Sequence, residues 1–92
     1  MPVLSILKVE DYARWKSDWD SSVDMRKASG QKSYQIFRTV DDPHTLVLFI
    51  EWDSLDNARR FVQSEELREA LQRSGVSQIE NYFLEELEKG TI

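Results

Sequence analysis

Four segments of the chain combine β-branched, aliphatic and aromatic residues in the way that strands do. They cover residues 3–9, 33–40, 45–52 and 77–87. Asp41-Asp42-Pro43 separates the second segment from the third, and because proline has no amide hydrogen for a sheet ladder, it predicts a hairpin turn. The third segment contains five consecutive apolar residues, 46–50, so we expect both of its faces to be covered.

Helical spacing of apolar residues marks the stretch between the first two strands. Three of them recur in steps of four and so fall on one stripe of a helix: Trp15, Trp19 and Val23. Asp11 is a suitable N-cap, and Gly30 suits the left-handed conformation that follows a helix end. We therefore predict one amphipathic helix over residues 12–28.

A second helical region follows the third strand. Its apolar stripe comprises Leu55, Ala58, Phe61 and Val62. Ser54 stands before this stripe as an N-cap, and Ser64, followed by two glutamates, is a second N-cap with acids in the first turn. We therefore predict a kink near residues 63–64 and a shorter helix that ends at Gly75.

Strands and helical regions therefore alternate in the order βαββαβ within one domain of 92 residues. This order is typical of the ferredoxin-like α+β fold, in which the helices pack on one face of a four-stranded antiparallel sheet. The other face is also apolar, because neighbouring residues such as Leu48 and Phe49 point to opposite sides. Leaving several such side chains in water costs several kcal/mol at roughly 25 cal/mol per Å². We therefore predict a homodimer in which two sheets pack face to face.

Composition and charge narrow the class of protein. The chain has no cysteine, which excludes disulfides, thiolate metal sites and a cysteine nucleophile. Its net charge of -5, without a segregated basic patch, repels nucleic acid and anionic membrane surfaces. The longest segment without a charged residue, 43–50, is too short to span a bilayer, and the first residues do not form a signal peptide. We expect a cytoplasmic protein that binds neither nucleic acid nor membranes.

Short motifs are distributed over nearly the whole chain. They are Asp11-Tyr12-Ala13-Arg14-Trp15-Lys16, Gly30, Phe37-Arg38 with Asp41-Asp42-Pro43, Glu51-Trp52-Asp53-Ser54, Ala58-Arg59-Arg60-Phe61, Ser64-Glu65-Glu66-Leu67 and Gly75-Val76. In these motifs the chain resembles the dimeric α/β-barrel superfamily, and within it the small antibiotic-biosynthesis-type monooxygenases. The resemblance implies a homodimer with a pocket between sheet and helices in each subunit. Members of the superfamily include cofactor-free oxygenases, cyclases, isomerases, haem-degrading enzymes and proteins of no known activity.

Three other functions of proteins with this strand order are disfavoured. The haem-degrading branch places a tryptophan and a haem-ligating histidine on the second helical region, where this chain has Phe61 and Leu71. An RNA-recognition module requires an aromatic, glycine-containing motif on the third strand, but residues 46–50 contain no glycine. A soft-metal carrier requires paired cysteines. We therefore expect no cofactor and no metal site.

Four residues are candidates for catalysis. His44, the only histidine, is a candidate general base at the start of the third strand. Tyr34, Arg38 and Asn81 are polar or amphipathic groups among apolar neighbours in predicted strands, so we expect some of them to point into a cavity or across the dimer interface. The alternative interpretation is that His44 is an ordinary turn residue and that Arg38 pairs with Glu51 between adjacent strands.

Four aromatic residues are candidate walls of a pocket: Trp15, Trp19, Trp52 and Phe61. Large rigid rings bind flat aromatic ligands by stacking and burial. The alternative interpretation is that these residues only pack the core, although one surface can serve both purposes.

The resemblance therefore implies, as the first hypothesis, a cofactor-independent monooxygenase that acts on an aromatic or polyketide-like metabolite. In such a reaction a base removes a proton from an acidic substrate in a dry pocket, and nearby donors stabilise the anion that reacts with dioxygen. Two alternatives remain open. One is a non-catalytic ligand-binding or structural dimer, and the other is a cyclase or isomerase that uses the same pocket.

Overall fold

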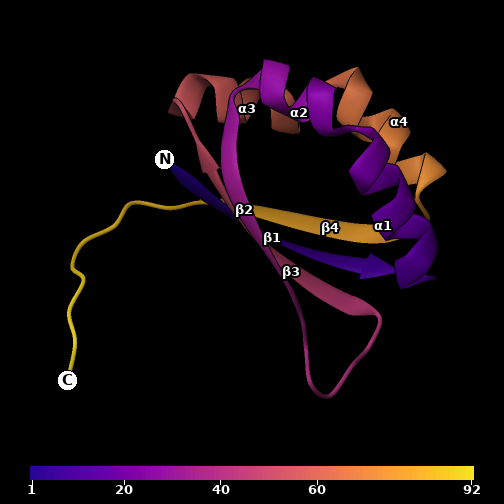
Figure 1. Ribbon diagram of the computed structural model, residues 1–92, viewed down its shortest axis with the longest axis horizontal. Coiled ribbons are helices and arrows are strands. Elements are labelled where there is room, and N and C mark those ends of the chain that lie inside the picture. Colours follow the sequence, from indigo (N-terminus) through magenta and orange to yellow (C-terminus); the bar gives the residue numbers. More distant parts are fainter.

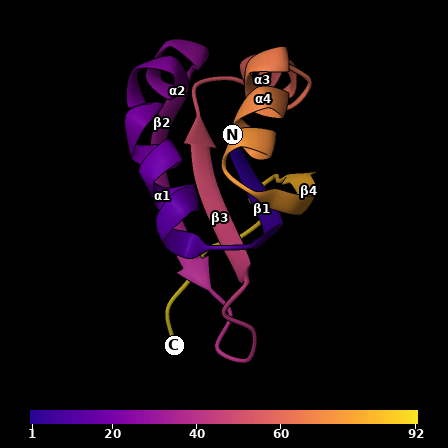
Figure 2. The same ribbon diagram turned by 90° about the vertical axis from the view of Figure 1, so that its right-hand side faces the viewer.

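Four antiparallel strands form one sheet in the computed structural model, which describes residues 1–92. The strands are β1 (Pro2–Val9), β2 (Gln31–Arg38), β3 (Thr45–Trp52) and β4 (Val76–Phe83), in the spatial order β2-β3-β1-β4. The helices are α1 (Tyr12–Ser21), α2 (Val23–Ser29), α3 (Leu55–Val62) and α4 (Glu65–Arg73). All of the helices lie on the same face of the sheet (Figure 1), with α1 and α2 beside α3 and α4 (Figure 2). The predicted ferredoxin-like α+β fold is confirmed.

The helix-covered face of β1 and β3 forms the core. Every second residue of both strands is buried, as the two-residue period of a strand requires. Leu7 and Leu46 lie opposite each other in the register and are only 2% and 0% exposed. Trp15 and Trp19 of α1 and Ala58 of α3 pack against these strands. The two central strands and the helices above them therefore hold most of the buried apolar surface.

The first helical region consists of two helices, because the helix is interrupted at Ser22. The carbonyl of Trp19 accepts hydrogen bonds from the Ser22 amide at 3.2 Å, the Ser22 hydroxyl at 2.9 Å and Arg26 Nη2 at 2.9 Å. These donors compete with the helical bond from the amide four residues on. Val23 is consequently 51% exposed and lies off the apolar stripe. The prediction of one continuous helix over residues 12–28 is wrong.

The predicted caps and kink of the second helical region are confirmed. Ser54 Oγ accepts a hydrogen bond from the Asn57 amide, and Ser64 Oγ accepts one from the Leu67 amide, both at 3.1 Å. Because Ser64 begins a new helix, α3 and α4 are separate helices with Gln63 at the junction. None of the helices is both long and apolar enough to cross a membrane.

Two strands have different limits from those that the sequence predicts. Gly30 adopts φ +113° at the end of α2, so the chain turns there and enters β2 already at Gln31. β4 ends at Phe83 because its partner β1 begins at Pro2, whose carbonyl accepts the last hydrogen bond from the Leu84 amide at 2.9 Å. Residues after 84 have no strand to pair with and form a tail that runs away from the sheet (Figure 1).

The second face of the sheet carries no helix (Figures 1 and 2). Six apolar or aromatic side chains from all four strands gather on it: Leu4, Ile6, Phe37, Val47, Phe49 and Tyr82. Leu4 lies opposite both Phe49 and Tyr82 in the register, which places it at the centre of the group. We call these six residues the open sheet face. Its composition confirms the expectation that neither face of the sheet is purely polar.

Candidate functional site

A cavity of about 70 Å³ lies between the sheet and the helices. Each of the four strands and four helices contributes to its lining. Twelve of the nineteen lining residues are hydrophobic, so a ligand would meet few polar groups there. The polar ones are Ser5, Asp18, Ser22, Arg26, Gln31, Ser74 and Asn81.

Helix α1 supplies an aromatic wall to this cavity. Trp15 and Trp19 lie four residues apart, on one face of the helix, and their rings stack with centroids 5.3 Å apart. They are 4% and 9% exposed. Tyr34 of β2 packs with its edge against Trp19 at 5.2 Å. These aromatic contacts fix the orientation of both indole rings, so the wall of the cavity at α1 is rigid and largely apolar.

The sheet supplies a polar pair to the cavity. Ser5 in β1 lies opposite Asn81 in β4, and the Ser5 hydroxyl donates a hydrogen bond to Asn81 Oδ1 at 2.6 Å. Because Oδ1 accepts from Ser5, the side-chain nitrogen of Asn81 remains as a donor. Ser5 is only 4% exposed, because it lies on a central strand among apolar residues. The pair therefore gives the apolar floor one fixed polar position.

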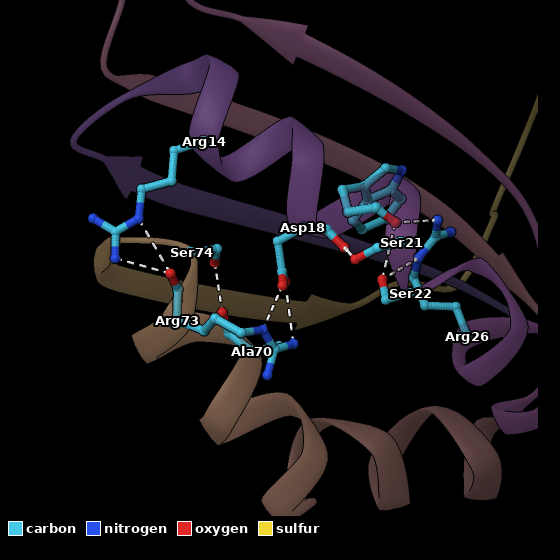
Figure 3. Close-up of polar contacts among 9 residues, drawn as sticks. Arg14, Asp18, Ser21, Ser22, Arg26, Ala70, Arg73 and Ser74 are labelled. Atoms are coloured by element: carbon cyan, nitrogen blue, oxygen red, sulfur yellow. Dashed lines mark hydrogen bonds and ion pairs between the residues drawn. The ribbon is translucent and has the colours of Figure 1, made fainter.

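A second polar contact joins α1 to α4 beside the cavity (Figure 3). Arg73 Nε donates to Asp18 Oδ1 at 2.5 Å, and Arg14 Nη2 donates to the carbonyl of Arg73 at 2.8 Å. The hydrogen bond to Asp18 raises the pKa of Arg73. Asp18 is the only acidic residue in the cavity lining, and its carboxylate is already held by a guanidinium.

Arg26 of α2 is the most unusual polar residue of the lining. It is 5% exposed, and its guanidinium lies 3.7 Å from the centroid of the Trp19 ring. Its hydrogen bonds go to neutral oxygens: Trp19 O at 2.9 Å, Ser22 Oγ at 3.3 Å and Gln31 Oε1 at 3.4 Å. None of the ion pairs of the chain includes Arg26. Desolvation by burial lowers the pKa of this guanidinium, against smaller opposing effects of Tyr34 and Asp20.

Some of the candidate catalytic and pocket residues predicted from the sequence lie together in the structure. Asn81, Trp15, Trp19 and Phe61 all line the cavity. Tyr34 does not line it but contacts Trp19 from the side. Their predicted roles in catalysis and binding stay predictions.

The remaining candidates lie elsewhere. Trp52 is buried in the core, where its ring packs against Phe61 at 5.2 Å, and it does not reach the cavity. Arg38 lies with its guanidinium 5.8 Å from the Tyr12 ring. The suggested ion pair between Arg38 and Glu51 is absent: the register places Arg38 opposite Leu46, and Glu51 receives the N-terminal ammonium instead.

His44 lies in the hairpin between β2 and β3, where it is exposed. Its Nδ1 is 3.0 Å from the Val9 carbonyl, and its amide donates to the Asp42 carboxylate at 3.0 Å. Hydrogen bonds from Lys8 Nζ, from Thr45 Oγ1 and from the His44 amide hold the pKa of Asp42 well below its usual range. His44 therefore contacts groups of the turn and does not line the cavity.

Sequence reasoning missed Arg26 and Ser5. Arg26 follows Trp19 by seven residues, the spacing of two helical turns. A helix over residues 12–28 therefore places this arginine on the same face as the tryptophans, which could have marked it as a residue of the site. Ser5 is the one polar residue between Val3 and Leu7 in a strand of apolar residues, which was a similar signal. No group of three or more His, Asp or Glu side chains is arranged to hold a metal ion.

Residues 10–73 match the family model of the antibiotic biosynthesis monooxygenases, and this segment is more than half of the chain. The chain belongs to the antibiotic biosynthesis monooxygenase family. The match covers α1 to α4 and ends just before β4, so it includes the aromatic wall and Arg26 but not Asn81. No curated protein sequence matches the chain.

Several solved structures share the fold of this chain. SnoaB, a cofactor-independent oxygenase from Streptomyces nogalater, superposes with a TM-score of 0.67 at 13% identity, over 94% of this chain and 93% of SnoaB. An antibiotic biosynthesis monooxygenase-type protein from Caulobacter crescentus superposes with a TM-score of 0.67 at 18% identity, over 92% of this chain and 89% of that one. A third structure, an antibiotic biosynthesis monooxygenase-type protein from Bordetella bronchiseptica, superposes with a TM-score of 0.65 at 16% identity, over 90% of this chain and 96% of that one. At these identities the likeness establishes the fold.

Proposed function

We propose that this chain is a homodimeric, cofactor-independent monooxygenase that acts on a small aromatic or polyketide-like metabolite. The observation that carries the proposal is the cavity between sheet and helices, with stacked tryptophans on α1 and the Ser5–Asn81 pair on the sheet. Membership in the monooxygenase family and the fold shared with a cofactor-independent oxygenase support it.

The proposed reaction requires no external reductant. The methylene group of an anthrone lies between two aromatic rings that conjugate it with the carbonyl group; it loses a proton to water, and the resulting enolate donates electrons to dioxygen. One oxygen atom becomes the new carbonyl oxygen at that carbon, and the other leaves as water, so that both hydrogens of the methylene end in water. With a quinol, one oxygen atom enters the ring to give a hydroxyquinone, and the other leaves as water. In this proposal the side-chain nitrogen of Asn81, which lines the cavity, donates to the enolate oxygen, because such a donor stabilises developing charge in an apolar site. His44 and Arg38 lie off the cavity and receive no role here.

The size of the cavity limits the substrate. Its volume of about 70 Å³ is well below the roughly 300–1,000 Å³ of pockets that hold drug-sized ligands. A one-ring substrate needs the least adjustment. A polycyclic substrate requires displacement of half-buried side chains on α3 and α4, such as Phe61, Leu67 and Leu71.

The dimer part of the proposal rests on the open sheet face. Each Å² of apolar surface that a partner covers contributes roughly 25 cal/mol, and six side chains on each copy offer such surface, with Phe37 50% and Tyr82 45% exposed and the other four half-buried. A second copy presents the same apolar surface and can cover it by two-fold symmetry.

Oxygen uptake tests the reaction. We expect purified protein to consume one dioxygen per product with anthrone- or quinol-like compounds, and one atom of labelled dioxygen to enter an anthrone product. Asn81→Ala is expected to lower kcat/KM roughly 100-fold. Gln78→Ala, an exposed position of the same strand, is the matched control and should leave it unchanged. Absence of oxygen uptake with the whole panel would contradict the proposed reaction.

One observation favours a second function, a non-catalytic ligand-binding dimer. The only acid of the cavity lining, Asp18, is engaged by Arg73, and no histidine reaches the cavity, so no free side-chain base is present there. This function predicts ligand binding without turnover. A cyclase or isomerase would form product without consuming oxygen, so product analysis beside the oxygen trace separates the three.

A further inference from the structure

The cavity holds several hydrogen-bond donors that lack acceptors. An arginine side chain has five N–H bonds, and the three hydrogen bonds of Arg26 leave two of them unused. Three buried side-chain donors have no partner, and two of them, Gln31 Nε2 and Trp19 Nε1, belong to residues of the cavity lining, whereas the third, Trp52 Nε1, does not. Arg26 lines the cavity as well. Buried donors are normally satisfied, so this group calls for a missing acceptor.

The charge of Arg26 is also uncompensated. Two acids of the preceding helix are already engaged by other cations: Asp20 with Lys16 Nζ at 2.6 Å, and Asp18 with Arg73. Asp24 on the same helix is exposed and makes no ion pair with Arg26. A buried guanidinium without an anion is costly, and an anion that reaches it removes this cost.

The guanidinium is held in place before any ligand arrives. It lies 3.7 Å from the centroid of the Trp19 ring, and its Nη2 donates a hydrogen bond to the Trp19 carbonyl where α1 gives way to α2. Figure 3 shows Arg26 beside Ser22 at this junction. A fixed, planar donor of this kind suits the two oxygens of a carboxylate or a single ionised oxygen on a ring. Stacking on an indole and hydrogen bonding to an oxyanion are compatible, because the N–H bonds lie in the plane of the guanidinium.

We propose that the α2 end of the cavity binds an oxyanion of the ligand, either a carboxylate or an ionised enol or phenol, with Arg26 as its anchor and Gln31 Nε2 and Trp19 Nε1 as further donors. The inference uses the cavity of the proposed function but needs no reaction with oxygen. β2 and β4 are the opposite edges of the sheet, so a ligand anchored beside Gln31 of β2 directs its other end toward Asn81 of β4.

Titrations followed by NMR test this assignment. The three tryptophans give three indole N–H signals, and a Trp19→Phe variant identifies the one from Trp19. Benzoate and 4-nitrophenolate serve as anionic probes for the two kinds of oxyanion, and benzamide is the neutral counterpart of benzoate. We expect at least one anionic probe to shift the Trp19 indole signal, while the signal of Trp52, which lies outside the cavity, stays in place. We expect benzamide to bind at least tenfold more weakly than benzoate if the site takes carboxylates.

Arg26→Gln is expected to weaken binding of the anionic probe roughly 10- to 100-fold, the loss of a charge-assisted hydrogen bond, and to leave benzamide unchanged. Lys27→Gln removes the same charge from an exposed position of α2, so it should change neither the affinity for the anionic probe nor the affinity for benzamide. Arg26→Lys, which keeps the charge, is expected to retain part of the affinity. If Arg26→Gln does not fold, the affinities of the unaltered protein for benzoate, 4-nitrophenolate and benzamide decide whether the cavity prefers an anion.

Several results would overturn the proposal: no binding of either anion, equal binding of benzamide, or an equal loss in Arg26→Gln and Lys27→Gln. The outcomes for the oxygenase are separate. If anions bind through Arg26 but no compound consumes oxygen, the anchor stands and the proposed reaction fails. If an acidic compound is oxidised equally well by Arg26→Gln, the reaction stands and the anchor fails.

Discussion

Phe49 lies on the open sheet face, opposite Leu4 of β1 and Gln35 of β2. The substitution Phe49→Asp replaces an aromatic ring of the proposed dimer interface by a charge. Phe49 is already half-buried in one chain, so a partner covers only the rest of its ring, which contributes at most about 1.5 kcal/mol. A two-fold interface contains the residue twice, so the substitution removes up to about 3 kcal/mol of association free energy, which raises the dissociation constant of the dimer up to roughly 100-fold. Two carboxylates facing each other in the interface would add to this effect.

Sedimentation velocity over a range of concentrations measures the association. We expect the unaltered protein to sediment as a dimer at micromolar concentration and Phe49→Asp to sediment with the 10.8 kDa mass of one chain. Val40→Asp places the same charge on a fully exposed side chain of the hairpin and should leave the dimer intact. Far-ultraviolet circular dichroism verifies that each variant is folded. A Phe49→Asp protein that is dimeric at the same concentrations as the unaltered protein would refute the reasoning, as would an unaltered protein that is monomeric.

Three further predictions concern the stability of one chain. Leu46 is 0% exposed, so Leu46→Ala should lower the free energy of unfolding in urea by about 2–5 kcal/mol, whereas Val40→Ala at a fully exposed position should have no effect. Ser64→Ala removes the cap of α4 and should cost about 0.5–2 kcal/mol, against no measurable cost for Ser17→Ala on an exposed part of α1; equal costs would argue against the cap. Hydrogen bonds from Lys8, Thr45 and the His44 amide lower the pKa of Asp42 below its ordinary value of 3.8, so its stabilising effect is present above that pH and is lost as the pH falls through the lowered value. The melting temperature of Asp42→Asn should therefore lie below that of the unaltered protein at pH 7, with a difference that shrinks on acidification below pH 3.8; a constant difference would contradict the lowered pKa.

The fold was predictable from local patterns. The apolar strand segments, the caps at Ser54 and Ser64 and the turn at Gly30 each act over a few residues, and the structure shows the same features. The break at Ser22 was not predicted, because the apolar spacing of Trp19 and Val23 continues through it. It depends on side-chain donors that compete for one carbonyl, an effect that hydrophobic periodicity does not register.

The site was predictable only in part. The tryptophans of α1 follow from helical periodicity, whereas the direction of a strand residue does not follow when residues of both parities are apolar. Ser5 and Asn81 could therefore not be paired before the register of β1 and β4 was known. Arg26 is buried through its contacts with Trp19, Ser22 and Gln31, three residues whose proximity depends on the break between α1 and α2.

A crystal structure of the protein with benzoate tests most directly whether the cavity is the functional site. We expect the ring to lie in the cavity beside Trp19 and the carboxylate to accept hydrogen bonds from Arg26. Benzoate found only on the outer surface, with the cavity empty at saturating concentration, would contradict this account.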